Sequence, residues 1–156
     1  MHTRLPLRTI AVVGAVVVVA MLAPIAAADS VYHTEHLALT PVGDAPLRSG
    51  FVQNIKAEGP QIYAHEIFVL NGAAPHTSYT VTRRFFFQDP GCTGTLVFSS
   101  DLASLETNAG GNAKAETFVV PEDAAGFAGV HGVQWTVKDS GGAVRYATRC
   151  TAVTLD

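Results

Sequence analysis

Two patterns of hydrophobic and polar positions divide this chain. Residues 9–28 form an apolar stretch without a charged side chain, whereas the sequence beyond residue 28 alternates apolar and polar positions with a period close to two. Such alternation is typical of β-strands with one buried face, because successive side chains point to opposite sides of a strand. The chain therefore divides into an apolar N-terminal segment, residues 1–28, and a single β-rich domain, residues 29–156.

The β-rich domain contains strand-like segments separated by clusters of Gly, Pro, Asn and Asp, which favour turns. The predicted strands are Val31–Thr40, Leu47–Ala57, Gln61–Leu70, Ser78–Phe87, Gly94–Ser99, Leu102–Thr107, Lys114–Val120, Val130–Lys138 and Ala143–Leu155. Pro121–Gly126 is predicted to form one helical turn, with proline first, acidic residues next and glycine last. Strands at this spacing predict an all-β fold, an antiparallel Greek-key β-sandwich.

The last two predicted strands indicate which face is buried. On the first of them one face carries His131, Val133, Trp135 and Val137, and the other carries Gln134, Thr136 and Lys138. On the returning strand the buried face is predicted to carry Val144, Tyr146, Thr148, Cys150 and Ala152, with Arg145 and Arg149 toward solvent. This alternation fits a sheet that is buried on one side.

The apolar N-terminal segment has the features of a secretory signal helix. Arg4 and Arg8 supply a basic start, an apolar core follows at Ile10–Met21, and Ala26–Ala28 supplies the small residues of a cleavage site. Cleavage is expected after Ala28, which would release a secreted, extracellular domain. An uncleaved anchor is the alternative, since about 20 apolar residues span a bilayer. The helix-breaking proline before the alanines favours cleavage.

Charge narrows the range of partners. The region beyond residue 28 holds all 13 acidic residues but only eight of the 10 basic ones, which gives it a formal charge of −5. A negatively charged domain without clustered Lys and Arg is not expected to bind nucleic acid or, after cleavage, a membrane surface. The expected partner is an unidentified extracellular ligand, either a protein or a carbohydrate.

Cys92 and Cys150 are the two cysteines of the chain. In an exported protein an even number of cysteines predicts a disulfide, and with two cysteines only one pairing exists. Closing this loop is worth about 4 kcal/mol in a chain-entropy model. A redox pair or a metal site is the alternative, which the wide separation and the lack of a C-x-x-C motif disfavour.

The segment from residue 70 to residue 81 carries a recognisable motif. Leu70, Gly72, Pro75 and Tyr79 belong to a pattern that resembles the L-x-G-x-x-P-x-T-x-Y-x-V signature of fibronectin type III domains. In that family the tyrosine forms a structural corner, in which its hydroxyl bonds to the backbone a few residues upstream. The resemblance implies an immunoglobulin-like sandwich in which this segment crosses between sheets. Because the tryptophan of this chain follows the tyrosine instead of preceding it, the exact topology and adhesive function of the family are not carried over.

Histidines are the candidate metal ligands, since imidazole binds copper and zinc. The candidates are His33, His65 and His131, which would have to meet across strands because the chain has no H-x-H pair. A copper- or zinc-binding sandwich is therefore one alternative function, although no cofactor is assigned from the sequence.

A small extracellular hydrolase is the other alternative. The chain has no G-x-S-x-G motif, and no catalytic residue is assigned. Such an enzyme would need a pocket that holds two or more of the polar candidates. These candidates are Ser99, Ser100 and Asp101, which are predicted to lie in a loop, together with Glu106, Glu116 and Glu122.

Arg83 and Arg84 precede three phenylalanines, Phe85–Phe87. Because neighbouring residues of a strand face opposite sides, one arginine must lie beside aromatic rings on the buried face. That arginine is predicted to reach solvent or to pair with Glu66 on a neighbouring strand. The functional alternative is an anion- or carbohydrate-binding face with aromatic platforms. Together these observations favour a non-enzymatic binding module, either secreted or at the cell surface.

The intact mass of the exported protein tests both the signal peptide and the disulfide. We expect the mass of residues 29–156 with both thiols oxidised, measured by mass spectrometry without reductant, because cleavage and oxidation accompany export. Reduction of the same sample is the control and should restore the two thiol hydrogens. A mass that retains residues 1–28, or free thiols at Cys92 and Cys150, would contradict export.

Overall fold

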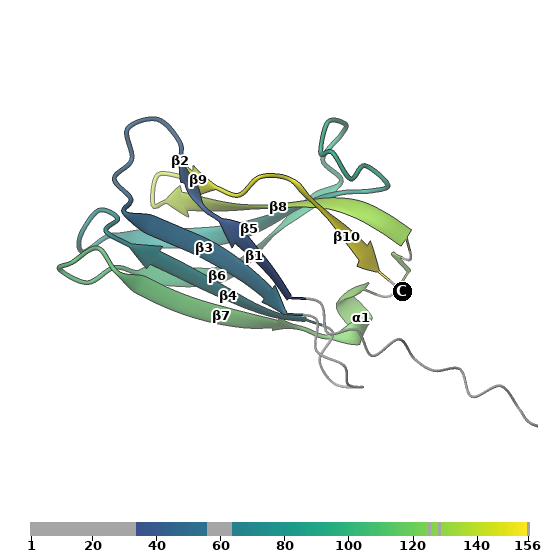
Figure 1. The fold of residues 1–156 in the computed structure, drawn as a ribbon, viewed down its shortest axis with the longest axis horizontal. Coiled ribbons are helices and arrows are strands. Elements are labelled where there is room, and N and C mark those ends of the chain that lie inside the picture. The colour runs from purple at the N-terminus through teal and green to yellow at the C-terminus, as the bar shows by residue number, and fades with distance from the viewer. Residues whose placement is uncertain (1–33, 56–63, 125, 128, 156) are drawn as a thin grey trace, which may run out of the picture.

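The computed structural model describes residues 34–55, 64–124, 126–127 and 129–155. Within these ranges the chain forms two antiparallel β-sheets packed face to face, with one short helix (Figure 1). The predicted all-β sandwich is confirmed. The signal segment and the first residues of the strands predicted at Val31–Thr40 and Gln61–Leu70 lie outside the described residues.

The two sheets contain four and six strands. The four-stranded sheet has the order β1 (Thr34–Ala38), β3 (Ser49–Ile55), β4 (Ala64–Asn71) and β7 (Ala113–Val119). The six-stranded sheet has the order β2 (Thr40–Pro41), β9 (Val144–Ala147), β8 (Gly129–Asp139), β5 (Ser78–Phe86) and β6 (Phe98–Glu106), and β10 (Thr151–Leu155) also pairs with β8.

The chain passes between the sheets several times. The β3–β4 hairpin lies in the four-stranded sheet and the β5–β6 hairpin in the other, after which β7 returns to pair with β4. The helix α1 (Pro121–Ala124), at the predicted helical turn, precedes β8, which pairs with β5. Figure 1 places α1 and the end of β10 at the same end of the sandwich. Among the described residues, no helix has the length and hydropathy needed to cross a membrane.

Alternating side chains fill the space between the sheets. On β8 the residues predicted to face inward, His131 to Val137 at every second position, are all buried. The inward positions of β3 and β4 are mostly apolar but include Asn54 and Glu66, which are both buried. These two residues oppose each other directly in the β3–β4 register. The core therefore contains a polar pair of neighbours at one end.

The strand predicted at Leu102–Thr107 and the last two residues of the strand predicted at Gly94–Ser99 belong to a single strand, β6, so the loop predicted between them is wrong. Residues 94–97 precede the strand, so most of the first prediction is also wrong. The β5–β6 register slips within β6, because Val81 opposes Ala103 while Thr82 opposes Asp101. Leu102 has no partner in this register and forms a β-bulge. Beside it, Asp101 Oδ1 accepts a 2.7 Å hydrogen bond from Thr82 Oγ1. Polar residues of this kind suit a strand at a sheet edge.

The single strand predicted at Ala143–Leu155 is also wrong, because it is divided into β9 and β10. The division falls at Thr148, whose Oγ1 accepts a 3.1 Å hydrogen bond from the backbone N–H of Trp135. The alternation reverses across this point. Ala152, predicted to be buried, is exposed, while its neighbour Thr151 is buried. The apolar side chains of β10 that pack against the core are Val153 and Leu155.

The predicted disulfide between Cys92 and Cys150 is confirmed. It joins the loop after β5 to the segment between β9 and β10, with Cα atoms 5.9 Å apart. The loop lies directly over Gly132 of β8, where a β-carbon would come within 2.9 Å of the Cys92 sulfur. A disulfide of this kind persists in an oxidising compartment.

The motif segment carries the chain from β4 to β5 and so from one sheet to the other. Gly72 adopts a φ of 70°, a conformation that favours glycine, and Tyr79 is buried at the start of β5. The Tyr79 hydroxyl lies 3.3 Å from that of Tyr146, and the Tyr146 hydroxyl donates to the Pro46 carbonyl at 2.8 Å. A pair of tyrosines therefore stands where the motif predicts a corner bonded to upstream backbone.

Tyr146→Phe is expected to lower the free energy of unfolding by about 2 kcal/mol and Tyr79→Phe by about 1 kcal/mol. Loss of the Tyr146 hydroxyl leaves both the Pro46 carbonyl and the Tyr79 hydroxyl without this partner, whereas loss of the Tyr79 hydroxyl removes one bond. Urea denaturation of both variants measures the two losses of stability. Equal losses would contradict an arrangement in which the Tyr146 hydroxyl makes two hydrogen bonds and the Tyr79 hydroxyl makes one.

The same variants test the ionisation of this pair. Burial, followed by the hydrogen bond to Tyr79, raises the pKa of Tyr146 above its ordinary value. The unfolded chain therefore loses this proton first, so the stabilisation is complete below about pH 10 and declines as the pH rises further. Tyr146→Phe should show a shallower alkaline loss of stability than the parent protein.

Candidate functional site

A buried ion pair links the two sheets at one end of the core. Glu66 projects inward from β4 with 2% of its side chain exposed, and Arg83 projects from β5 with 19% exposed. Arg83 Nη1 donates to Glu66 Oε1 at 3.1 Å, and the indole Nε1 of Trp135 donates to Glu66 Oε2 at 3.1 Å. Arg83 and Trp135 are partners in the β5–β8 register, so one strand pair presents both donors.

Pairing is what makes a carboxylate tolerable at this depth, since an isolated buried charge costs several kcal/mol. Glu66 receives one donor on each oxygen, and one of the donors is a cation. Well-packed apolar residues would stabilise such a core about as well. The ion pair is therefore a candidate for a role in recognition.

A cavity of about 60 Å³ lies beside this ion pair. Its apolar wall consists mainly of Phe85, Phe98, Phe127, Trp135, Val119, Val133, Val153 and Leu155. Three of the aromatic rings contact one another, with Phe85 stacked on Phe98 at 4.8 Å between centroids and Phe127 at 5.3 Å from Phe85. We call this cavity the end pocket.

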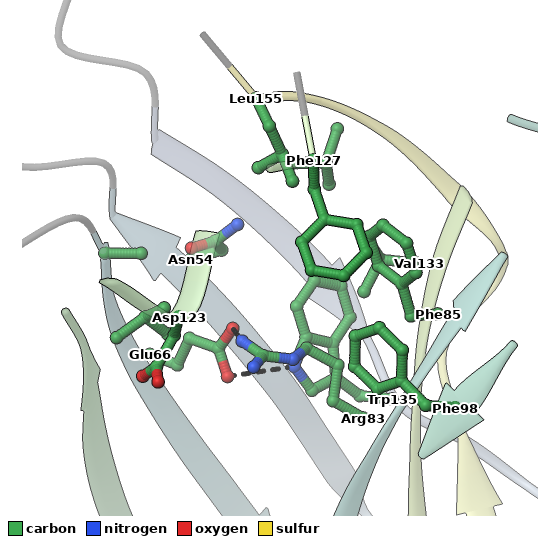
Figure 2. Close-up of a pocket in the computed structure, with 13 residues that line it drawn as sticks. Asn54, Glu66, Arg83, Phe85, Phe98, Asp123, Phe127, Val133, Trp135 and Leu155 are labelled. Atoms are coloured by element: carbon green, nitrogen blue, oxygen red, sulfur yellow. Dashed lines mark hydrogen bonds and ion pairs between the residues drawn. The ribbon is translucent and has the colours of Figure 1, made fainter. Parts of the chain in front are cut away.

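Polar side chains line the opposite side of the end pocket. Figure 2 shows Asn54 and Glu66 on the side opposite Phe85, Phe98 and Phe127, and Asp123 also lines the pocket. Asn54 is 6% exposed, and its Oδ1 has no hydrogen-bond partner among the described residues. Leaving a buried acceptor unpaired costs about 1–3 kcal/mol. This oxygen is therefore an unpaired acceptor buried beside the end pocket and not exposed to it.

A second depression, of about 310 Å³, adjoins the end pocket and shares Arg83 and Asp123 with it. It also contains Ser100 and Asp101, two of the residues considered for a hydrolase. No histidine is among the described residues that line it, and the Asp101 carboxylate accepts from Thr82. The depression thus brings together a serine and an acid without the base of a catalytic triad.

The candidate metal ligands His65 and His131 lie apart. His33 lies outside the described residues. His65 is on the outer side of β4, where its Nε2 lies 3.1 Å from Glu116 Oε2 and its ring stacks on Phe118. His131 is on the inner side of β8. Among residues 34–55, 64–124, 126–127 and 129–155, no group of three or more His, Cys, Asp or Glu side chains could hold a metal ion.

His131 instead supports the wall of the end pocket. Its Nδ1 accepts a 3.0 Å hydrogen bond from the Gln88 backbone, so its Nε2 donates to the Phe127 carbonyl at 2.9 Å. Both ring nitrogens are therefore engaged with backbone. This fixes Phe127 near Phe85 and places the buried histidine in a structural role.

The two arginines have different partners, as their opposite faces predict. Of the two arrangements predicted for the inward arginine, the pairing with Glu66 is the one observed, and the arginine is Arg83. Arg84 lies on the other face, donates to Gln134 Oε1 at 2.8 Å and sits 5.3 Å from the centroid of the Phe86 ring. The arginine that joins the candidate site is thus Arg83.

Asn54 and Phe127 are site residues that the sequence interpretation did not single out. Asn54 carried a usable signal, because it is a polar residue at an inward position of an alternating strand. Phe127 follows the helical turn, where no alternation of apolar and polar residues predicts which way its side chain points. Comparison with models of protein families and with curated protein sequences finds no match for this chain.

Arg83→Met is expected to lower the free energy of unfolding by about 3 kcal/mol, because it leaves the Glu66 carboxylate buried without its cation. Adding Glu66→Gln should recover most of this loss, since glutamine removes the charge and keeps an acceptor for Trp135. Chemical denaturation of the single and double variants measures the coupling. Arg84→Met is the matched control, with an expected loss below about 1 kcal/mol. Purely additive losses in the double variant would contradict a buried ion pair.

Proposed function

We propose that this protein is an exported binding module, secreted or held at the cell surface, whose ligand occupies the end pocket. The observation that carries this proposal is the end pocket itself, whose wall includes the contacting rings of Phe85, Phe98 and Phe127. Ligand sites are typically concave and apolar, with a few polar groups that fix orientation. The buried pair of Glu66 and Arg83 supplies further polar groups at the same place.

Export is supported by two independent features. The basic and apolar pattern of residues 1–28 is typical of a signal peptide. The disulfide between Cys92 and Cys150 is typical of a compartment in which thiols oxidise. We assign the protein to the extracellular space on this basis.

We also propose an immunoglobulin-like Greek-key topology for the sandwich. In its support, β7 returns beside β4 after the β5–β6 hairpin, and β8 returns beside β5. Return of a strand to an earlier neighbour by a long connection is typical of Greek keys. The N-terminal strands are divided between the sheets, with β1 on β3 and β2 on β9.

Fluorescence of Trp135 tests the binding site directly, because it is the one tryptophan of the chain and it lines the end pocket. A panel of small cationic, neutral and anionic compounds is expected to contain members that shift its emission in a saturable manner. Val153→Phe should abolish the shift, since it adds a ring to a residue of the pocket wall.

Ala152→Phe is the matched control, because Ala152 is the exposed neighbour on the opposite face of β10. This variant should respond like the parent protein. Equal responses from both variants, or no saturable response to any compound of the panel, would contradict the proposed site.

A further inference from the structure

We infer that the protein forms a two-fold symmetric dimer in which β7 of one copy pairs antiparallel with β7 of a second copy. The four-stranded sheets of the two copies then become one continuous sheet. This inference concerns the free edge of that sheet and does not depend on what the end pocket binds.

β7 is a regular strand at an open sheet edge. It pairs with β4 over all seven of its residues without a slip in register, and no other strand pairs with it among the described residues. Figure 1 shows it as the outermost strand of its sheet. Every second residue of an edge strand directs its N–H and C=O away from the sheet, where another strand can bond to them.

The other edge strands carry features that discourage pairing. β6 has the bulge at Leu102 and the carboxylate of Asp101 beside it. β2 has two residues, one of which is Pro41. β1 has a neighbour at its edge, because Thr151 Oγ1 of β10 donates to Glu35 Oε1 at 3.4 Å. Proteins use bulges, prolines and short strands to protect sheet edges, and within the described part of the chain β7 has none of these.

The turn before β7 sets the start of the pairing. The Asn112 backbone N–H donates to Asn108 Oδ1 at 3.1 Å, and the Asn112 carbonyl accepts from the Asn108 backbone N–H at 3.1 Å. Both backbone groups of Asn112 are therefore engaged, so the pairing begins at Ala113. A two-fold axis at Ala115 pairs residues 113–117 of one copy with the same residues of the other in reverse order.

The charges of β7 select this position of the axis. Lys114 and Glu116 are both exposed on the outer face, and Glu116 Oε2 lies 3.1 Å from His65 Nε2. With the axis at Ala115, Lys114 of each copy lies directly opposite Glu116 of the other. An axis at Lys114 or at Glu116 would instead place two like charges opposite each other. Opposite charges at directly paired positions stabilise a sheet, whereas like charges destabilise it.

The remaining side chains of β7 suit the same register. Ala113 and Ala115 face the core, are partly buried and are small, so they leave room for a neighbouring strand. Phe118 is 51% exposed. In this register it lies diagonal to Lys114 of the other copy, within reach of the hydrocarbon stem and the ammonium group of that side chain. A second copy thus covers apolar surface that a single copy exposes.

Reversal of either charge tests the interface. Lys114→Glu and Glu116→Lys each turn two opposite-charge pairs into two like-charge pairs, so each variant alone should raise the dissociation constant of the dimer at least about tenfold. Sedimentation equilibrium of the parent and the variants measures this constant. Both side chains are exposed, so both variants are expected to fold. Lys138→Glu on β8 is the matched control and should dimerise like the parent protein.

Two combinations should restore the dimer. An equimolar mixture of the two single variants is expected to form a heterodimer, because each chain then meets the opposite charge at both positions. The double variant Lys114→Glu/Glu116→Lys should form a homodimer with a dissociation constant within about threefold of that of the parent.

A cysteine at the axis tests the register. Directly opposed residues of an antiparallel pair have Cα atoms about 4.5–5.5 Å apart, within the range that a disulfide spans. Ala115→Cys should therefore form an intermolecular disulfide under mild oxidation, detected by non-reducing electrophoresis. Thr117→Cys is the control, since the two copies of this position lie about 13 Å apart along the strands.

Four results would overturn the inference. One is a parent protein that stays monomeric at its highest soluble concentration, and another is a dimer that neither charge reversal weakens. The third is a mixture of the two single variants that forms no heterodimer. The fourth is disulfide formation by Thr117→Cys as fast as by Ala115→Cys, because the register would then be wrong.

Discussion

Glu66 places a carboxylate between the two sheets, and the surrounding structure has to supply the donors that water would otherwise provide. Both donors come from the opposite sheet, the cation from Arg83 and the indole N–H from Trp135. Apolar side chains tolerate small shifts of one sheet over another, whereas short hydrogen bonds do not. The carboxylate therefore fixes the relative position of β4, β5 and β8, which is the kind of specificity that buried polar groups contribute in some proteins.

One end of the core holds a pair of tyrosines and the other holds the ion pair of Glu66 and Arg83. Tyr79 and Tyr146 lie toward the Asp139 end of β8, where their hydroxyls meet and one of them bonds to a loop carbonyl. Toward the other end of β8 the ion pair replaces apolar packing, and Asn54 extends the polar region across the register from Glu66. The cavity lies at this polar end of the core.

Strands whose side chains follow strict alternation could be predicted from the sequence, as for β5 and β8, whose ends differ from the prediction by at most one residue. The prediction failed at the bulge in β6, where the β5–β6 register slips, and between β9 and β10, where the Thr148 hydroxyl accepts the backbone N–H of Trp135. The Arg83–Glu66 pair was predictable because a charge in an aromatic strand needs a partner. The end pocket was not, because a single sequence does not show which end of a sandwich remains open.

The interruption at Thr148 has a consequence for how the pocket is built. Because side chains change sides with every residue of a strand, the number of residues between β9 and β10 decides which face of β10 meets the core. With the length present here, Val153 and Leu155 reach the pocket wall. A chain longer by one residue in this segment would present Ala152 there in place of Val153. The number of residues between β9 and β10 thus determines which side chains of β10 line the end pocket.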